Sequence, residues 1–117
     1  MVIAGNLTWD LQISYIKKLI KEGVTMKLTN EIIHEKLNEN HGWIFKENRI
    51  EKQYNFKDFV SAMKFVNKLA EIAEKENHHP DILIFEWNKV KIMFSTHDEG
   101  GVTEKDFRLA KLADGLK

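Results

Sequence analysis

The stretch EKENHHPDILIFEWNKVKIMFSTHDEGGVTEKD, residues 74–106, decides how the rest of the chain is interpreted. It holds the end of an amphipathic segment, a proline, an apolar run at residues 82–85, a second run that places Val90, Ile92 and Phe94 on one face, and a double glycine. Proline cannot continue a helix, and alternation with a period of two is typical of half-buried strands. The stretch therefore predicts a helix end, two strands joined as a hairpin, and the start of another helix.

The segments on either side extend this pattern to the order α-β-β-α-β-β-α. Thr29 and Thr103 are suited to begin helices, because a threonine hydroxyl can accept a hydrogen bond from the first turn. The predicted elements are a helix from Thr29 toward Asn40, strands at Trp43–Lys46 and Ile50–Phe56, a long helix at about Lys57–Asn77, strands at Ile82–Trp87 and Val90–Thr96, and a last helix from Thr103 to Gly115. Turns are predicted at Asn48-Arg49 and Asn88-Lys89. This order predicts an α+β fold of two layers, a four-stranded antiparallel sheet with helices packed on one face.

The first 25 residues have two interpretations. Apolar residues recur at helical spacing between Leu11 and Ile20, and Gly23 follows them, so the segment fits a short amphipathic helix. It fits equally an extension ahead of the working domain, because Met26 stands just before a clean helix start. We therefore divide the chain into an N-terminal extension, residues 1–25, and one domain, residues 26–117.

The composition excludes several classes of protein. The 117 residues carry 18 basic and 18 acidic side chains, so the chain lacks the net positive charge typical of proteins that bind nucleic acid or anionic membranes. There is no cysteine, which excludes disulfides and thiolate metal sites and agrees with a reducing compartment. No apolar run approaches the ~20 residues that span a bilayer. We expect one domain in the cytoplasm that binds neither nucleic acid directly nor a membrane.

Three of the five histidines lie within the opening stretch. Glu74 and His78 are four residues apart, so on a continuous helix the carboxylate would orient the imidazole as a general acid. His79 must point elsewhere, and His97 follows the last strand, where it could join the same pocket. The alternative is that these histidines cap a helix or lie in a surface loop.

The remaining candidate residues have structural interpretations. Zinc would need three protein ligands, and two adjacent histidines rarely direct both rings at one ion, so we expect no metal. His34 and His41 are expected to be solvated or satisfied side chains without a role in the site. Trp43 and Trp87 are expected in the core.

The spacing of these residues resembles the signature of the pterin-4a-carbinolamine dehydratases. Every element of that signature is present. It consists of Glu74, three free positions, the run His78-His79-Pro80, and then Trp87, His97 and Asp106 at fixed intervals. The flanking segments 55–59, 88–90 and 101–103 agree, and the likeness covers about Met26 to Ala113. The chain departs from the family at Asn77, a position where some relatives carry an acidic residue.

The resemblance implies the removal of water from a 4a-hydroxytetrahydropterin, giving a quinonoid dihydropterin, with no metal or cofactor. The implied catalytic residues are His78, His79 and His97, with Glu74 orienting His78. The implied substrate-binding residues are His78, His79, Pro80, Thr96, His97, Asp98 and Glu99. Trp87 and Asp106 belong to the signature, and for Asp106 a structural role at the start of the last helix is equally open.

The implied partners are a small-molecule pterin and further copies of the chain. The family forms homotetramers and some homodimers. Some members also serve as a dimerisation partner of a transcription factor, so a binding module that needs no catalysis is the alternative function.

Overall fold

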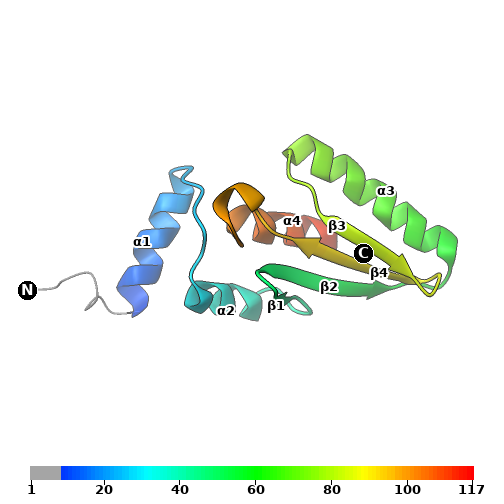
Figure 1. The fold of residues 1–117 in the computed structure, drawn as a ribbon, viewed down its shortest axis with the longest axis horizontal. Helices are drawn as coiled ribbons and strands as arrows, with labels where there is room; N and C mark the ends of the chain where they lie inside the picture. The colour runs from blue at the N-terminus through cyan, green and yellow to red at the C-terminus, as the bar shows by residue number, and fades with distance from the viewer. Residues whose placement is uncertain (1–8) are drawn as a thin grey trace, which may run out of the picture.

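A computed structural model of the chain describes residues 9–117, so the first eight residues of the predicted extension lie outside the described part. The order of elements confirms the predicted α-β-β-α-β-β-α pattern and places one helix in front of it (Figure 1). The elements are α1 Trp9–Lys21, α2 Asn30–Asn38, β1 Ile44–Lys46, β2 Arg49–Asn55, α3 Phe59–Glu76, β3 Asp81–Phe85, β4 Lys89–Phe94, the 3-10 turn η2 His97–Glu99, and α4 Glu104–Asp114.

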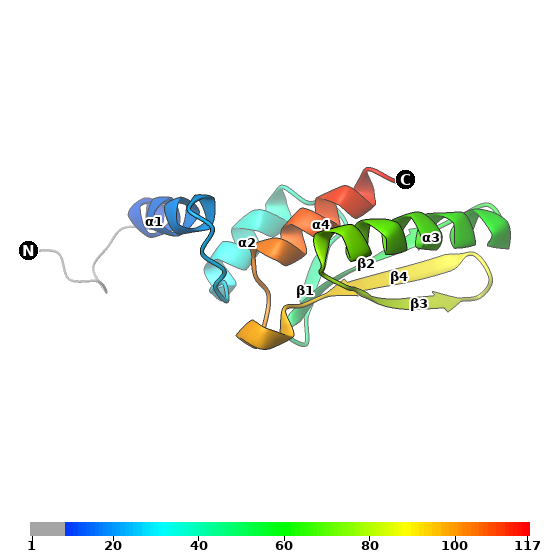
Figure 2. The same ribbon diagram turned by 90° about the horizontal axis from the view of Figure 1, so that it is seen from above.

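The four strands form one antiparallel sheet in the order β1-β2-β4-β3. Figure 2 shows α2, α3 and α4 on the same face of this sheet, while no described helix covers the other face. The fold is therefore the two-layer α+β arrangement that the sequence predicts. Antiparallel sheets commonly bury one face only, in agreement with the alternation along the strands.

The core lies between the sheet and the helices. Five residues of β2 and β4 on the face toward the helices are at most 4% exposed: Ile50, Tyr54, Val90, Ile92 and Phe94. These strand residues face a stripe of buried residues on α3 that recur at helical spacing: Ala62, Phe65, Leu69 and Ala73.

Both hairpins turn earlier than predicted. The turns are at Glu47-Asn48 and Glu86-Trp87, and all four residues have positive φ between 47° and 64°. The β1–β2 loop has two residues, and positive φ at both matches the right-handed twist of paired strands. The β3–β4 loop has three residues, since Phe85 pairs with Lys89, and its first two have positive φ. Trp87 therefore lies at a hairpin tip and is 60% exposed, so its predicted place in the core is wrong. Trp43 is 4% exposed, as predicted.

Helix α1 packs on the domain at one end of the molecule (Figure 1). Ile13 is buried in the core, and Ile16 and Ile20 pack against that core. Lys17 Nζ lies 3.4 Å from a carboxylate oxygen of Glu35 on α2. The helical interpretation of this segment is therefore confirmed for Trp9–Lys21. Among the described helices, none combines the length and the apolar character that crossing a membrane requires.

Candidate active site

The end of α3 directs the two adjacent histidines in different directions. Asn77 caps α3 in the left-handed conformation, with φ 52° and ψ 41°, and the backbone N–H of His78 donates to the carbonyl of Ala73. Asparagine tolerates this conformation better than most residues. The side chain of His78 consequently turns inward and is 11% exposed, whereas that of His79 is 56% exposed.

His78 is held by a buried carboxylate from α4. Its Nε2 atom lies 2.6 Å from Oδ1 of Asp106, whose side chain is fully buried. The imidazole also stacks on the ring of Phe94, with 6.2 Å between centroids and 12° between planes. Because Nε2 is engaged by Asp106, Nδ1 is the ring atom left for a substrate; it makes no hydrogen bond within the described residues.

The second oxygen of Asp106 joins this contact to the cap of α4. Oδ2 accepts hydrogen bonds from Thr96 Oγ1 at 2.9 Å and from the backbone N–H of Thr103 at 2.8 Å. The two threonine hydroxyls are themselves hydrogen-bonded at 2.7 Å, and Thr103 and Asp106 complete a capping box. Asp106 is therefore structural and also contacts a candidate catalytic residue, so both interpretations left open by the sequence apply to it.

The expected contact between Glu74 and His78 is wrong. Oε1 of Glu74 lies 2.6 Å from Nε2 of His79, with both side chains more than half exposed. The physical reason is Asn77: helical geometry ends at Glu76, so the spacing of four residues no longer brings His78 over Glu74. Glu74 thus orients the outer histidine, and Asp106 orients the inner one.

All three histidines of the signature line one cavity of about 290 Å³. His97 reaches it from η2, where it is exposed, and Thr96 N donates to the carbonyl of Gly101 at 2.8 Å, closing the loop that carries it. The cavity wall is formed by Asn77, His78, His79, Ser95, Thr96, His97, Asp98 and Lys105. Imidazoles and a primary ammonium around one open cavity can donate and accept protons at a bound molecule.

The cavity includes most, not all, of the predicted site residues. Of the predicted substrate-binding residues, Pro80 and Glu99 lie next to it in the chain but are not part of its wall. Trp87 lies at the tip of the β3–β4 hairpin, at the opposite end of these strands (Figure 1).

Sequence analysis missed Ser95 and Lys105. Ser95 could have been found from the sequence, since it lies on the same predicted strand face as Met93, opposite the apolar face. Lys105 had only its position beside Asp106. Within the described residues, no group of three or more histidine, cysteine or acidic side chains is placed to hold a metal ion.

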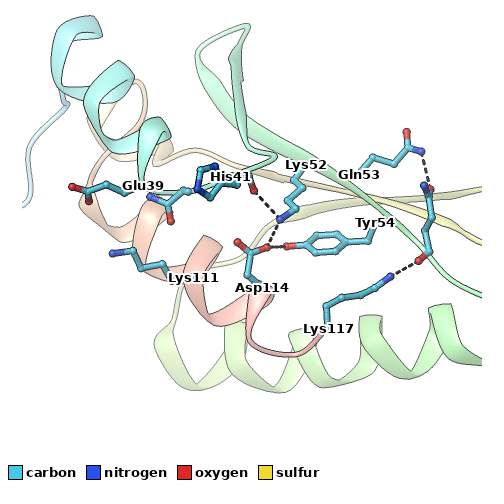
Figure 3. Close-up of a pocket in the computed structure, with 10 residues that line it drawn as sticks. Glu39, His41, Lys52, Gln53, Tyr54, Lys111, Asp114 and Lys117 are labelled. Carbon is cyan, nitrogen blue, oxygen red and sulfur yellow. Dashed lines mark hydrogen bonds and ion pairs between the residues drawn. The ribbon is translucent and has the colours of Figure 1, made fainter.

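A larger cavity, of about 770 Å³, lies between the end of α2, β2 and the end of α4. Figure 3 shows Lys52 and Tyr54 directed at Asp114, which accepts from Lys52 Nζ at 2.8 Å and from the Tyr54 hydroxyl at 2.5 Å. Its other oxygen accepts from Trp43 Nε1 at 3.0 Å. Burial, followed by the Asp114 carboxylate, raises the pKa of Tyr54, so this hydroxyl stays a donor.

These paired groups join the residue before β1 to β2 and α4, and the wall of the larger cavity contains none of the signature histidines. His41, which lines it, is exposed, as predicted, and so is His34. We therefore assign the Asp114 cluster a structural role and place the candidate active site at His78, His79 and His97.

Comparison with known proteins agrees with this geometry. The family described as pterin 4 alpha carbinolamine dehydratase matches residues 26–116. A protein of Sulfurisphaera tokodaii, provisionally named pterin-4-alpha-carbinolamine dehydratase, is 49% identical over 90 residues, which are 77% of this chain and 96% of that protein. A protein of Nostoc punctiforme with the same provisional name is 45% identical over 94 residues, covering 80% of this chain and 100% of its own.

Two solved structures share the fold. The crystal structure of a transcriptional coactivator/pterin dehydratase from Brucella melitensis superposes with a TM-score of 0.73 and 34% identity, covering 77% of this chain and 97% of that one. A pterin dehydratase-like protein identified as a RuBisCO assembly factor in the alpha-carboxysome has a TM-score of 0.51 and 24% identity, over 63% of this chain and 84% of its own; this likeness concerns the fold alone. On these matches and on the signature residues placed around one cavity, the chain belongs to the pterin 4 alpha carbinolamine dehydratase family.

Proposed function

We propose that this chain removes water from a 4a-hydroxytetrahydropterin and so produces the quinonoid dihydropterin. The observation that supports the proposal most directly is the cavity shared by His78, His79 and His97, with His78 seated on Asp106. Family membership supports the same reaction class. The reaction needs no metal and no cofactor, because it is an elimination whose two proton transfers suit imidazoles.

The proposed step transfers one proton to the leaving group and removes one from the ring. The bond between C4a and the hydroxyl oxygen breaks as a protonated imidazole donates to that oxygen, which leaves as water. A ring nitrogen gives up its proton to a second imidazole, so the enzyme ends with its original number of protons. We assign His78 and His97 to the leaving hydroxyl, while His79, oriented by Glu74, mainly holds the pterin and takes the proton from the ring nitrogen.

The test is stopped-flow dehydration of synthetic 4a-hydroxytetrahydropterin by the wild type, His78→Ala and His97→Ala. We expect acceleration by the wild type and a loss of about 10²–10⁴-fold in each variant, the usual contribution of a general acid or base. His41→Ala is the matched control, because His41 is exposed and lines the other cavity, and it should keep the wild-type rate. A folded wild type that gives no acceleration would disprove the proposal.

The alternative is a dimerisation or transcriptional cofactor-type binding module. It is favoured by the Brucella melitensis neighbour, which is described as a transcriptional coactivator/pterin dehydratase, and by Phe59 and Val60 of α3, which are 52% and 61% exposed. We propose that the chain assembles with itself as a homodimer or homotetramer in the cytoplasm.

Sedimentation of the wild type and of Phe59→Ser tests the proposed assembly. A smaller species for the variant at unchanged turnover would separate assembly from catalysis. A wild type that stays monomeric at micromolar concentration would contradict the assembly.

A further inference from the structure

A second cavity adjoins the histidine cavity at His97. Its volume is about 280 Å³, and its wall is formed by Glu47, Asn48, Arg49, Asp81, Ser95, His97, Gly100 and Gly101. Ser95 and His97 belong to the walls of both cavities. Each cavity alone falls just below the ~300–1,000 Å³ typical of small-molecule sites, whereas the two together fall within that range.

The register of the sheet brings opposite charges to this second cavity. Ile50 of β2 pairs with Phe94 of β4, so Arg49 comes opposite Ser95, one residue further along. Asp81 begins β3 and pairs with Met93. Since side chains alternate between the two faces, Arg49, Ser95 and Asp81 lie on the face that no described helix covers. A guanidinium and a carboxylate thus flank the end of β4 from its two neighbouring strands.

Both charged groups have hydrogen-bonding capacity that the fold does not use. Arg49 lies 3.6 Å from Glu51 and 3.7 Å from Glu47, longer than the ~2.7–2.9 Å of a charge-assisted hydrogen bond, and its buried Nε has no hydrogen-bond partner. Asp81 is exposed and takes part in none of the ion pairs formed by the described residues. By contrast, Asn48 is committed, since its Nδ2 donates to the carbonyl of Gly100 at 2.6 Å.

We propose that this second cavity binds the pyrimidine edge of the pterin, and the inference rests on the proposed function. The pyrimidine ring presents an amino group at C2 and an N–H at N3, two parallel donors that match the two oxygens of Asp81. It also presents a carbonyl at C4, an acceptor that matches the guanidinium of Arg49. C4 is bonded directly to C4a, the carbon that loses the hydroxyl. A residue that lies between the pyrimidine edge and C4a must therefore contact both parts of the pterin. His97 has this position, because it belongs to the walls of both cavities.

The test compares two reduced ligands by anaerobic calorimetry: 6-methyltetrahydropterin and its 2-oxo counterpart, which lacks the 2-amino group. We expect the wild type to prefer the pterin by about 10- to 100-fold, as for a hydrogen bond to a charged group. Asp81→Asn should abolish that preference. Arg49→Gln should weaken the binding of both ligands by the same factor, because both ligands keep the C4 carbonyl. Glu71→Gln, an exposed carboxylate on α3, is the control and should behave as the wild type.

The kinetics separate this inference from the proposed function. In dehydration assays Asp81→Asn should raise KM about 10- to 100-fold and leave kcat near the wild-type value, since its contact is with the ligand in both ground and transition state. If the wild type binds the pterin selectively but does not dehydrate, the proposed function fails and the binding site stands. If Asp81→Asn keeps the wild-type preference for the 2-amino ligand, or if the wild type has no preference, the inference is overturned.

Discussion

The imidazole of His78 and the carboxylate of Asp106 lie 2.6 Å apart, although 28 residues separate them in the chain. The carboxylate is fully buried, and its other oxygen receives the Thr96 hydroxyl and the Thr103 backbone N–H. One side chain therefore fixes the orientation of the candidate acid and satisfies the first turn of α4. A carboxylate that holds one ring nitrogen of a histidine sets which tautomer faces the cavity.

Asp106→Asn should impair both stability and turnover. An amide offers one acceptor oxygen where the carboxylate has two, so we expect the free energy of unfolding to fall by about 1–3 kcal/mol. We expect kcat to fall by about 10²-fold, the lower end of the range for acid–base groups, because the residue acts through His78. Urea denaturation and stopped-flow kinetics measure the two effects. Glu71→Gln, an exposed carboxylate on α3, is the control, and a wild-type kcat in Asp106→Asn would contradict the assignment.

Glu74→Gln should have a small effect on turnover. Glu74 and His79 are 78% and 56% exposed, and exposed ion pairs contribute only about 0–1 kcal/mol. We therefore expect kcat/KM to fall less than about fivefold, in the same assay, against a much larger loss in His78→Ala. Equal losses in Glu74→Gln and His78→Ala would show that the outer pair carries the chemistry.

Asn77→Ala should destabilise the protein, whereas Asn77→Gly should not. Asn77 has φ 52°, in the left-handed region that costs most residues about 1–2 kcal/mol and glycine almost nothing. We expect the midpoint of urea denaturation to fall for alanine and to stay near the wild-type value for glycine. Identical midpoints for both variants would mean that the cap conformation costs nothing at this position.

Asp114→Asn should destabilise the fold and spare catalysis. The carboxylate accepts from Trp43, Lys52 and Tyr54, and it lies in the larger cavity, away from the signature histidines. We expect a loss of about 1–3 kcal/mol in the free energy of unfolding, from guanidinium denaturation, with kcat unchanged in the folded protein. A loss of kcat without a loss of stability would assign that cavity a functional role.

The raised pKa of Tyr54 predicts that the folded protein loses stability at alkaline pH. Its pKa is raised in the folded state above the ordinary ~10, chiefly by burial and then by Asp114. Above about pH 10 the unfolded chain therefore loses this proton first and binds fewer protons than the folded chain, so stability falls as pH rises. The excess stability of the wild type over Tyr54→Phe should shrink between about pH 8 and pH 11. Parallel stability curves for the two proteins would contradict this.

The order and type of the elements could be predicted because the sequence is locally consistent. Alternation along Ile50–Tyr54 and Val90–Phe94 indicates the buried face of the sheet, and Thr29 and Thr103 cap their helices as expected. These signals depend on residues close together in the chain, where geometry is fixed by the period of the element. The signature intervals likewise bring His78, His79 and His97 to one cavity.

The partners of the site residues could not be predicted, for two physical reasons. Whether Glu74 meets His78 or His79 depends on the single left-handed residue Asn77, which sequence spacing does not reveal. The contact of His78 with Asp106 depends on how α4 docks, a relation between distant segments. The predicted place of Trp87 is wrong because an apolar aromatic residue is usually buried, and here the β3–β4 loop begins at Glu86 and so includes Trp87.

The shared role of Asp106 also sets how firmly each histidine is anchored. His78 contacts one oxygen of a fully buried carboxylate whose other oxygen accepts from the cap of α4, so its release would leave a buried charge short of a partner. His79 and His97 are exposed and can move with local fluctuations of their loops. The cavity thus combines one histidine that is fixed by a buried carboxylate with two exposed histidines that can move as a ligand enters and leaves.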